Sequence, residues 1–188
     1  MRRRARCRIF SFALVSATAW LLRKAARYYV ERGLLSSEAS AVGWTLYLLH
    51  VAATLSSARR PSLELPVNAR LPAATGSLLM LSGSALYLAS IRRFASIGQV
   101  SGRQPHGLVT SGPYRFSRNP QIFGWSLVLG GAALAGRSAK SLVLVVGFFL
   151  AHRLYLPVEE RHLERTFGEI YQRYRKEVPR YVYLPIQC

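Results

Sequence analysis

Long uncharged stretches alternate with short basic segments along this chain of 188 residues. Residues 39–57 run nineteen positions without a charge, and residues 71–91 run twenty-one. A helix needs about 20 apolar residues to cross a hydrocarbon core of about 30 Å. We therefore predict a membrane-spanning helix in each of these two stretches.

A second pair of uncharged segments covers residues 120–136 and 141–152, separated by a short linker that contains Arg137 and Lys140. This spacing predicts a tight helical hairpin. An earlier segment, residues 9–22, has only fourteen residues between Arg8 and Arg23. Its length suits a signal-peptide core or a short span, and the acid-free basic start before it is also compatible with an organelle address. We expect four or five membrane helices.

The spans contain glycines that let helices approach closely in lipid, namely Gly76, Gly83, Gly130 and Gly131. Beyond Pro157, apolar side chains recur at helical spacing: Leu163, Phe167, Ile170 and Tyr174. The other faces of that segment carry basic residues: Arg161, Arg165, Arg173 and Lys176. This pattern predicts a C-terminal amphipathic helix against anionic lipid headgroups.

The fold predicted from these patterns is an all-α polytopic membrane protein. Residues 1–38 form a basic N-terminus with a short hydrophobic segment, either a span or a targeting sequence. Residues 39–188 form one membrane domain. Its two polar stretches, residues 105–120 and 159–174, flank the predicted hairpin, so folding the hairpin brings them together.

Composition narrows the class of protein. The chain is 51% apolar and has 26 basic residues against 8 acidic ones. Basic charge alone suits RNA as well as anionic lipid, but here the basic residues lie between long uncharged stretches, which favours a membrane protein without nucleic acid. All eight acids are Glu, which excludes triads and cation loops built on Asp. The two cysteines, Cys7 and Cys188, leave the redox compartment open.

Charge distribution also predicts an orientation. The loop with Arg92, Arg93, Arg103, Arg115 and Arg118 and the basic C-terminal tail are separated by two spans, so both lie on one side. Lys and Arg accumulate in cytoplasmic loops, which places this side in the cytoplasm, in a cell or organelle membrane. With five spans the basic N-terminus would face outward, against the same rule.

The first polar stretch, PHGLVTSGPYRFSRNP, has a turn signal at Gly112-Pro113. Asn119 suits a helix N-cap and Pro120 suits the first helical position. Free backbone N–H groups at such a helix start are able to hold a carboxylate.

At these residues the chain resembles the isoprenylcysteine carboxyl methyltransferases and related membrane phospholipid methyltransferases. The resemblance covers about residues 101–180. The first family motif is matched at His106, Leu108, Val109, Gly112, Tyr114, Arg118, Asn119 and Pro120. The second is matched at Glu159, Glu160, Leu163, Phe167, Gly168 and Tyr171.

The resemblance implies an enzyme that transfers a methyl group from S-adenosylmethionine to an apolar acceptor entering from the bilayer. It implies a cofactor site made by seven residues: His106, Leu108, Val109, Gly112, Tyr114, Asn119 and Pro120. It also implies that three residues stand near the reacting groups: Arg118, Glu159 and Glu160. The sulfonium is already a good methyl donor, so such an enzyme mainly aligns the reactants and excludes water.

Several functional alternatives remain open. The acceptor expected first is the carboxylate of a prenylated cysteine or a similar apolar carboxylate or thiol, and the second is a phospholipid headgroup amine. The family usually has His at the position of Asn119 and Tyr at that of Ile122. Because of these two differences, a third alternative stays open: a non-catalytic scaffold or lipid binder with a degenerate cofactor fold. An RNA-associated membrane protein is a fourth.

The singled-out residues also have purely structural interpretations. Arg118 is placed to anchor a headgroup phosphate, and His106 to bond backbone. Glu159 and Glu160 would favour the positive start of a tail helix. The remaining histidines, His50, His152 and His162, share no metal-ligand spacing, so we expect no metal site. Oligomeric state is not indicated by the sequence.

Overall fold

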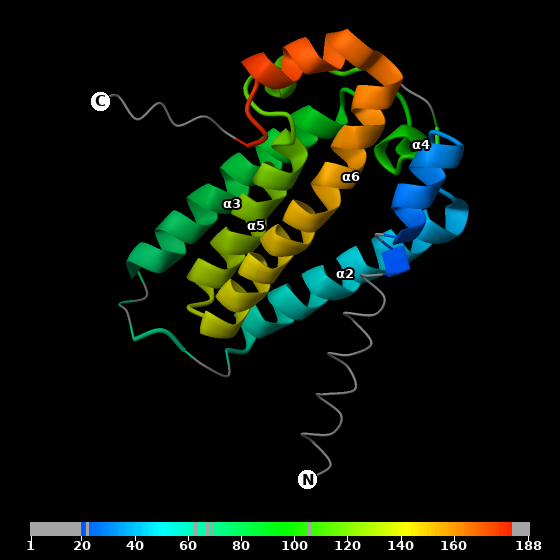
Figure 1. Ribbon diagram of the computed structural model, residues 1–188. Coiled ribbons are helices and arrows are strands. Elements are labelled where there is room, and N and C mark those ends of the chain that lie inside the picture. Colours follow the sequence, from blue (N-terminus) through cyan, green and yellow to red (C-terminus); the bar gives the residue numbers. More distant parts are fainter. Residues whose placement is uncertain are drawn as a thin grey trace.

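The computed structural model describes residues 20–21, 23–61, 64–66, 68, 70–104 and 107–181. Within these residues the fold is all-α. Residues 23–31 are helical, and the named elements are α2 (Ser37–Arg59), α3 (Arg70–Ile91), α4 (Ile97–Val100), the 3-10 helix η1 (Gly112–Arg115), α5 (Pro120–Ala135) and α6 (Ala139–Glu177). The four long helices run side by side as a bundle (Figure 1).

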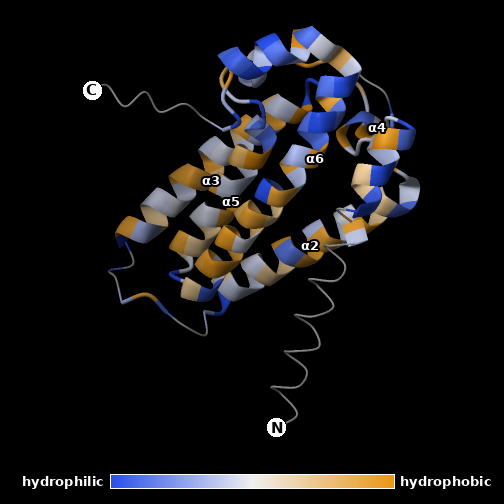
Figure 2. Cartoon of the chain, in the orientation of Figure 1, coloured by the Kyte–Doolittle hydropathy of each residue, from blue (hydrophilic) through white to orange (hydrophobic). Residues whose placement is uncertain are grey.

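The long helices confirm the predicted membrane architecture. Three of them, α2, α3 and α6, are long and apolar enough to cross a membrane, and α5 is a shorter apolar helix. Hydrophobic residues dominate along these helices, whereas hydrophilic ones gather at one end of the bundle (Figure 2). The predicted segment at residues 9–22 lies outside the described residues except for Trp20 and Leu21, which are helical.

The predicted hairpin is present between α5 and α6. Pro120 occupies the first turn of α5, and Ser138 caps α6 by accepting a hydrogen bond from the Ser141 N–H at 3.2 Å. The turn between the helices includes Arg137 at φ 47°. The hairpin places the start of α5 and the second half of α6 at the same end of the bundle (Figure 1).

Glycines bring α3 and α5 into backbone contact. A Cβ added to Gly76 would lie 2.5 Å from the Gly131 carbonyl oxygen, and one added to Gly83 would lie 2.5 Å from that of Gly124. The prediction of close packing is therefore confirmed for Gly76, Gly83 and Gly131. It was wrong for Gly130, which meets nothing within 4 Å, because it lies one residue round the helix from the interface.

α6 is too long to lie entirely within a bilayer. Its 39 residues extend about 58 Å at 1.5 Å per residue, and Arg153 is the only charged residue between Lys140 and Glu159. We therefore take residues 141–158 as its membrane-spanning part. The tail helix expected after Pro157 is a continuation of α6, and the irregularity comes instead at Gly168, with φ 51° and ψ −126°.

The irregularity at Gly168 changes which side chains face inward. Tyr171, Tyr174 and Val178 form a buried cluster, with Leu163 and Phe167 packed against it. Ile170, expected on the apolar face, is 59% exposed. An uninterrupted helix would align residue 170 with residues 163 and 167, and the non-helical turn at Gly168 breaks that alignment.

Candidate active site

The first polar stretch forms a tight loop before α5. Gly112 has φ +62°, a conformation that favours glycine, and the flexible end of the Arg93 side chain lies 2.6 Å from where a Cβ would be. Tyr114 in η1 is buried, contacts Phe94 edge to face, and donates a hydrogen bond to Gln121 Oε1 at 3.1 Å. The loop is thus built around a fixed tyrosine.

The two polar stretches meet, as the sequence predicts. The Tyr174 hydroxyl donates a hydrogen bond to the Tyr114 carbonyl oxygen at 2.7 Å. Leu108 packs against the cluster of Tyr171, Tyr174 and Val178. The start of α5 and the end of α6 are therefore held together by both a buried hydrogen bond and apolar contact. Burial raises the pKa values of the Tyr114 and Tyr174 hydroxyls, which keeps both protonated.

A buried ion-pair network lies where the stretches meet. Arg118 Nη1 donates to Glu160 Oε1 at 2.8 Å, and Arg180 donates through Nε to Oε1 at 2.9 Å and through Nη2 to Oε2 at 2.5 Å. The side chains of Arg118 and Glu160 are only 10% and 9% exposed. The hydrogen bonds that Arg180 donates to Glu160, reinforced by the charge of that carboxylate, raise the pKa of Arg180.

This network orients the Arg118 guanidinium but does not use all of its hydrogen-bond donors. Its Nη1 also donates to the Tyr171 hydroxyl at 3.2 Å, and its backbone N–H bonds the Pro179 carbonyl at 2.9 Å. Its Nε–H is buried and has no hydrogen-bond partner within the described part of the chain. A buried unpaired donor costs about 1–3 kcal/mol, which a ligand oxygen would recover.

Asn119 and Ser117 attach the chain after α6 to the start of α5. The Asn119 side-chain amide donates to the Arg180 carbonyl at 3.0 Å, and the Ser117 hydroxyl donates to the same oxygen at 3.3 Å. Asn119 occupies the predicted N-cap position, but its side chain makes no capping bond because it is used for Arg180. The Arg180 carbonyl therefore contacts the first polar stretch directly. Its guanidinium is linked to the same stretch through Glu160, which accepts from Arg118.

Glu159 differs sharply from its neighbour. Burial and the charge of Glu160 raise the pKa of Glu159 to about 7. No hydrogen bond or ion pair joins its carboxylate to any described residue, yet it keeps some accessible surface. The helix-dipole explanation for both glutamates is wrong, because α6 begins at Ala139, twenty residues earlier.

The sequence-predicted site residues are gathered at this end of the bundle. Glu160, Arg118, Tyr114 and Asn119 share the contacts above, Pro120 is fully buried as the first residue of α5, and Val109 is half-buried in the loop. His106 lies outside the described residues. Sequence reasoning did not single out Arg180, although the Pro179-Arg180 pair directly after an amphipathic helix was an available signal.

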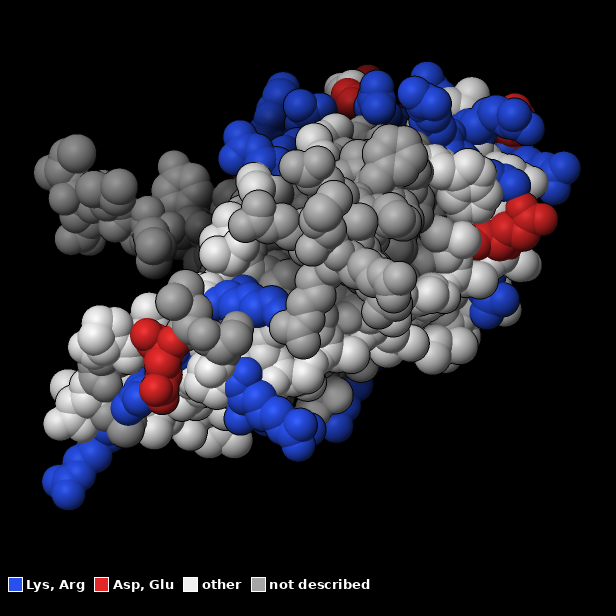
Figure 3. Space-filling view, turned by 90° about the horizontal axis from the view of Figure 1, so that it is seen from below, with Lys and Arg blue, Asp and Glu red and all other residues white. Residues whose placement is uncertain are grey.

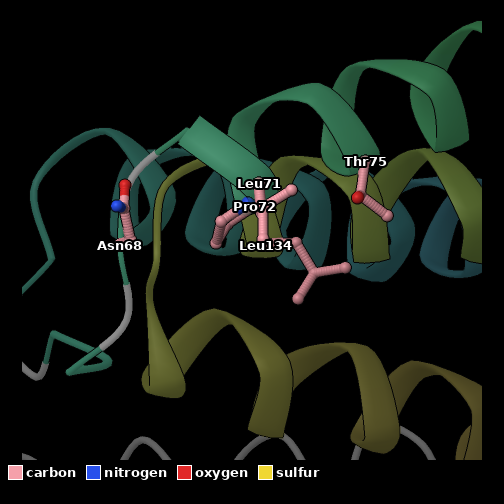
Figure 4. A pocket seen from close by; sticks show the side chains of 5 residues that line it. All are labelled: Asn68, Leu71, Pro72, Thr75 and Leu134. Atoms are coloured by element: carbon pink, nitrogen blue, oxygen red, sulfur yellow. The ribbon is translucent and has the colours of Figure 1, made fainter.

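Seen from below, the visible charged side chains are mostly Lys and Arg, in keeping with the net charge of +18 (Figure 3). A pocket lies between the start of α3 and the end of α5, at the end of the bundle opposite the site (Figure 4). Asn68, Leu71, Pro72, Thr75 and Leu134 line it. It contains none of the motif residues, so it is not part of the candidate site.

Comparison with known proteins agrees with this geometry. A family model described as phospholipid methyltransferase matches residues 71–170. Protein-S-isoprenylcysteine O-methyltransferase A of Arabidopsis thaliana is 32% identical over 110 residues, which are 55% of each chain. Protein-S-isoprenylcysteine O-methyltransferase of Schizosaccharomyces pombe is 35% identical over 89 residues, 46% of this chain and 37% of the relative.

A third relative has a different name. Cobalt-zinc-cadmium resistance protein CzcN of Cupriavidus metallidurans is 33% identical over 104 residues, 54% of this chain and 47% of the relative. The chain spans about half the length of the curated relatives it matches, between 37% and 55%. No solved structure matches it significantly.

Proposed function

Because the chain belongs to the phospholipid methyltransferase family, we propose that it transfers a methyl group from S-adenosylmethionine to the carboxylate of an apolar, lipid-linked acceptor. The acceptor that fits best is a prenylated cysteine with a free carboxylate. Two relatives are named as enzymes of that specificity. The observation that carries the choice of a carboxylate is the oriented, partly unpaired guanidinium of Arg118.

The residues at this end of the bundle suit the cofactor. S-adenosylmethionine supplies a methyl group activated on a positively charged sulfonium. Glu159 offers a desolvated carboxylate to which no described residue supplies a cationic partner, and this carboxylate complements the sulfonium charge. His106, Leu108, Val109, Gly112, Tyr114, Asn119 and Pro120 are the residues we assign to holding the cofactor. The tightly packed loop around Tyr114 would keep water from the reacting methyl group.

Arg118 would orient the acceptor carboxylate. A guanidinium binds a carboxylate through two parallel N–H groups, and Glu160 and Tyr171 fix the plane of this one. A carboxylate is ionised near neutral pH and attacks without a general base. Glu160 fits a supporting role, because it accepts hydrogen bonds from both arginines and so holds Arg118 in place.

A second candidate function, methylation of a phospholipid headgroup amine, rests on Glu159. An ammonium acceptor must lose a proton before it attacks, and a base is most effective when its pKa is near the working pH. Glu159, with a pKa of about 7, meets this condition. The nearby Arg118 disfavours a cationic acceptor, so we rank the carboxylate first.

The membrane partners follow from the same charges. Arg and Lys side chains on the second half of α6, such as Arg161, Arg165 and Arg173, are exposed and would contact anionic headgroups. We assign this end of the bundle to the cytoplasmic side. The scaffold alternative requires that no cofactor binds.

The test uses membranes that hold the full chain, labelled S-adenosylmethionine and three acceptors: a farnesylated cysteine derivative, its methyl ester, and phosphatidylethanolamine. We expect base-labile label on the free carboxylate alone. Stable label on phosphatidylethanolamine would instead establish the amine reaction. Absence of transfer together with absence of cofactor binding by calorimetry would favour the scaffold.

A further inference from the structure

Among the residues that the structure describes, none is a cationic partner of Glu159, although the chain has 26 basic residues for 8 acidic ones. The adjacent Glu160 accepts hydrogen bonds from two arginines, whereas Glu159 accepts none from the described residues. A desolvated carboxylate without a partner is costly, and proteins normally pair such a group. The chain has many arginines that could pair with Glu159, yet none of the described ones does. This indicates that the charge of Glu159 serves a ligand.

One aromatic side chain from the N-terminal helix lies across this carboxylate. Tyr155, Glu159 and His162 are at positions i, i+4 and i+7 of α6, so they share one face of the helix. The Tyr29 hydroxyl lies 3.3 Å from that of Tyr155, and the Tyr29 ring stacks on the His162 ring at 4.5 Å and 15°. Because these three residues share one helix face, Tyr29 lies over residue 159. The pKa of the Tyr29 hydroxyl agrees, since it is raised by burial, then by Tyr155 and by the charge of Glu159.

Tyr29 is held in place by the loop that precedes the first polar stretch. The Leu35 N–H donates a hydrogen bond to the Gly102 carbonyl at 2.8 Å. Gly102 has φ +69°, and a Cβ there would lie 3.0 Å from the Tyr29 hydroxyl. The helix at residues 23–31 is therefore docked against both this loop and α6, although it lies outside the residues matched by the family model.

We propose that Tyr29 and Tyr155 form aromatic walls over Glu159 and that this arrangement recognises an alkylated cation, the sulfonium of S-adenosylmethionine. Aromatic rings and a carboxylate attract a sulfonium but gain little from a neutral thioether. The site therefore favours the methyl donor over its demethylated product, S-adenosylhomocysteine. This inference rests on the proposed function. It adds Tyr29, from the helix at residues 23–31, as a residue that distinguishes the methyl donor from its product.

The test compares two ligands by calorimetry on the detergent-purified full chain. S-adenosylmethionine should bind more tightly than S-adenosylhomocysteine, by about three- to thirtyfold. Tyr29→Leu and Glu159→Gln should each reduce this ratio toward one, mainly by weakening the donor, while Tyr29→Phe keeps most of it. Tyr28→Leu is the matched control, because Tyr28 adjoins Tyr29 but contacts Lys24 and Arg32 instead.

The outcomes separate this inference from the function it rests on. If folded wild-type protein binds neither ligand, the proposed function fails. If both bind and the ratio is one, or is unchanged in Tyr29→Leu, the function stands and the aromatic walls are wrong. A short-chain phosphatidylcholine forms the last arm: binding that depends on Tyr29, with an unchanged cofactor ratio, would show that the cation is a lipid headgroup and overturn the cofactor assignment.

Discussion

Two adjacent glutamates on α6 face opposite electrostatic surroundings. Successive residues of a helix point about 100° apart. Glu160 pairs with Arg118 and Arg180, whereas Glu159 interacts with Tyr29 and Tyr155. The Glu160 carboxylate is neutralised by two arginines of the protein, whereas the Glu159 carboxylate has no cationic partner among the described residues. This division assigns Glu160 to positioning Arg118 and Glu159 to meeting a cation.

The raised pKa of Glu159 predicts that the stability of the fold depends on pH. The titratable and charged groups around Glu159 are Tyr29, Tyr114, Tyr155, His162, Tyr171, Glu160 and, beyond Glu160, Arg118. The pKa of Glu159 is raised from 4.5 to about 7 in the folded chain, so folding favours its protonated form. Its contribution to stability is complete below about pH 4.5 and is lost as the pH rises through 7.

Glu159→Gln should therefore be more stable than wild type at pH 8 and nearly equal to it at pH 5, in thermal unfolding without cofactor. Saturating S-adenosylmethionine should narrow the difference at pH 8, because the ligand stabilises only the carboxylate form strongly. A difference independent of pH would show that Glu159 keeps an ordinary pKa.

Arg118 should distinguish the two candidate acceptors. Arg118→Lys keeps the charge but loses the bidentate geometry, so turnover of a carboxylate acceptor should fall about tenfold or more while cofactor affinity changes little. The rate should also remain flat from neutral to mildly alkaline pH. Arg93→Lys, a second arginine of the same loop region, is the control for a general effect of the substitution. A harmless Arg118→Lys, with turnover that rises with pH and collapses in Glu159→Gln, would favour the amine acceptor.

Much of the candidate site could be predicted from the sequence. The residues that could not be predicted were missed for one common reason. Arg118, Glu159 and Glu160 lie in motifs that flank a hairpin, so their proximity follows from local pattern. Arg180 and Tyr29 do not, because each reaches the site through contacts outside those motifs. The distance from Tyr29 to Glu159 along the chain leaves no periodic signal.

At the scale of elements, the interface between α3 and α5 depends on glycine. In lipid, helices gain from van der Waals contact and close approach rather than from burial of apolar surface. Gly83 and Gly124 provide that approach near the site, and Gly76 and Gly131 provide it farther along. The start of α5, and with it Asn119 and Arg118, is positioned by this interface.

Gly83→Ala should therefore destabilise the protein by about 1–3 kcal/mol, because the new methyl group would lie 2.5 Å from the Gly124 carbonyl oxygen. Gly130→Ala is the matched control. It faces open space, and alanine has the higher helix propensity, so its stability should be unchanged or slightly higher. Thermal unfolding in one detergent measures both. Equal effects of the two substitutions would contradict the glycine-mediated contact.

Helix number and approximate bounds could be read from uncharged runs, whereas irregularities within helices could not. Pro157 is a conventional helix breaker because it has no N–H for the Arg153 carbonyl, but α6 continues through it. Membrane helices tolerate proline when nearby groups satisfy the freed backbone. Gly168 has the real irregularity, and nothing in its neighbours identifies it beforehand.

For the molecule as a whole, the two ends of the bundle differ in charge. Residues 92–118 contain five Lys and Arg and residues 159–181 contain six, all at the end that has the candidate site. The opposite end has five in residues 59–70 and 137–140 together. The excess predicts that the end with Arg118 and Glu160 faces the cytoplasm, where a soluble cofactor would reach it.

This orientation is tested with single cysteines in a chain whose Cys7 and Cys188 are replaced by serine. Asn68→Cys lies at the far end and Gln172→Cys on the last turns of α6, and both positions are exposed. In sealed vesicles with the cytoplasmic face inward, a membrane-impermeant maleimide should label Asn68→Cys at once and Gln172→Cys only after permeabilisation. Because Asn68, beside the start of α3, and the end of α6 lie at opposite ends of one bundle, the two sites must respond oppositely whatever the orientation. Simultaneous labelling would therefore contradict the membrane-spanning bundle itself, whereas an exchange of the two responses would contradict only the cytoplasmic assignment.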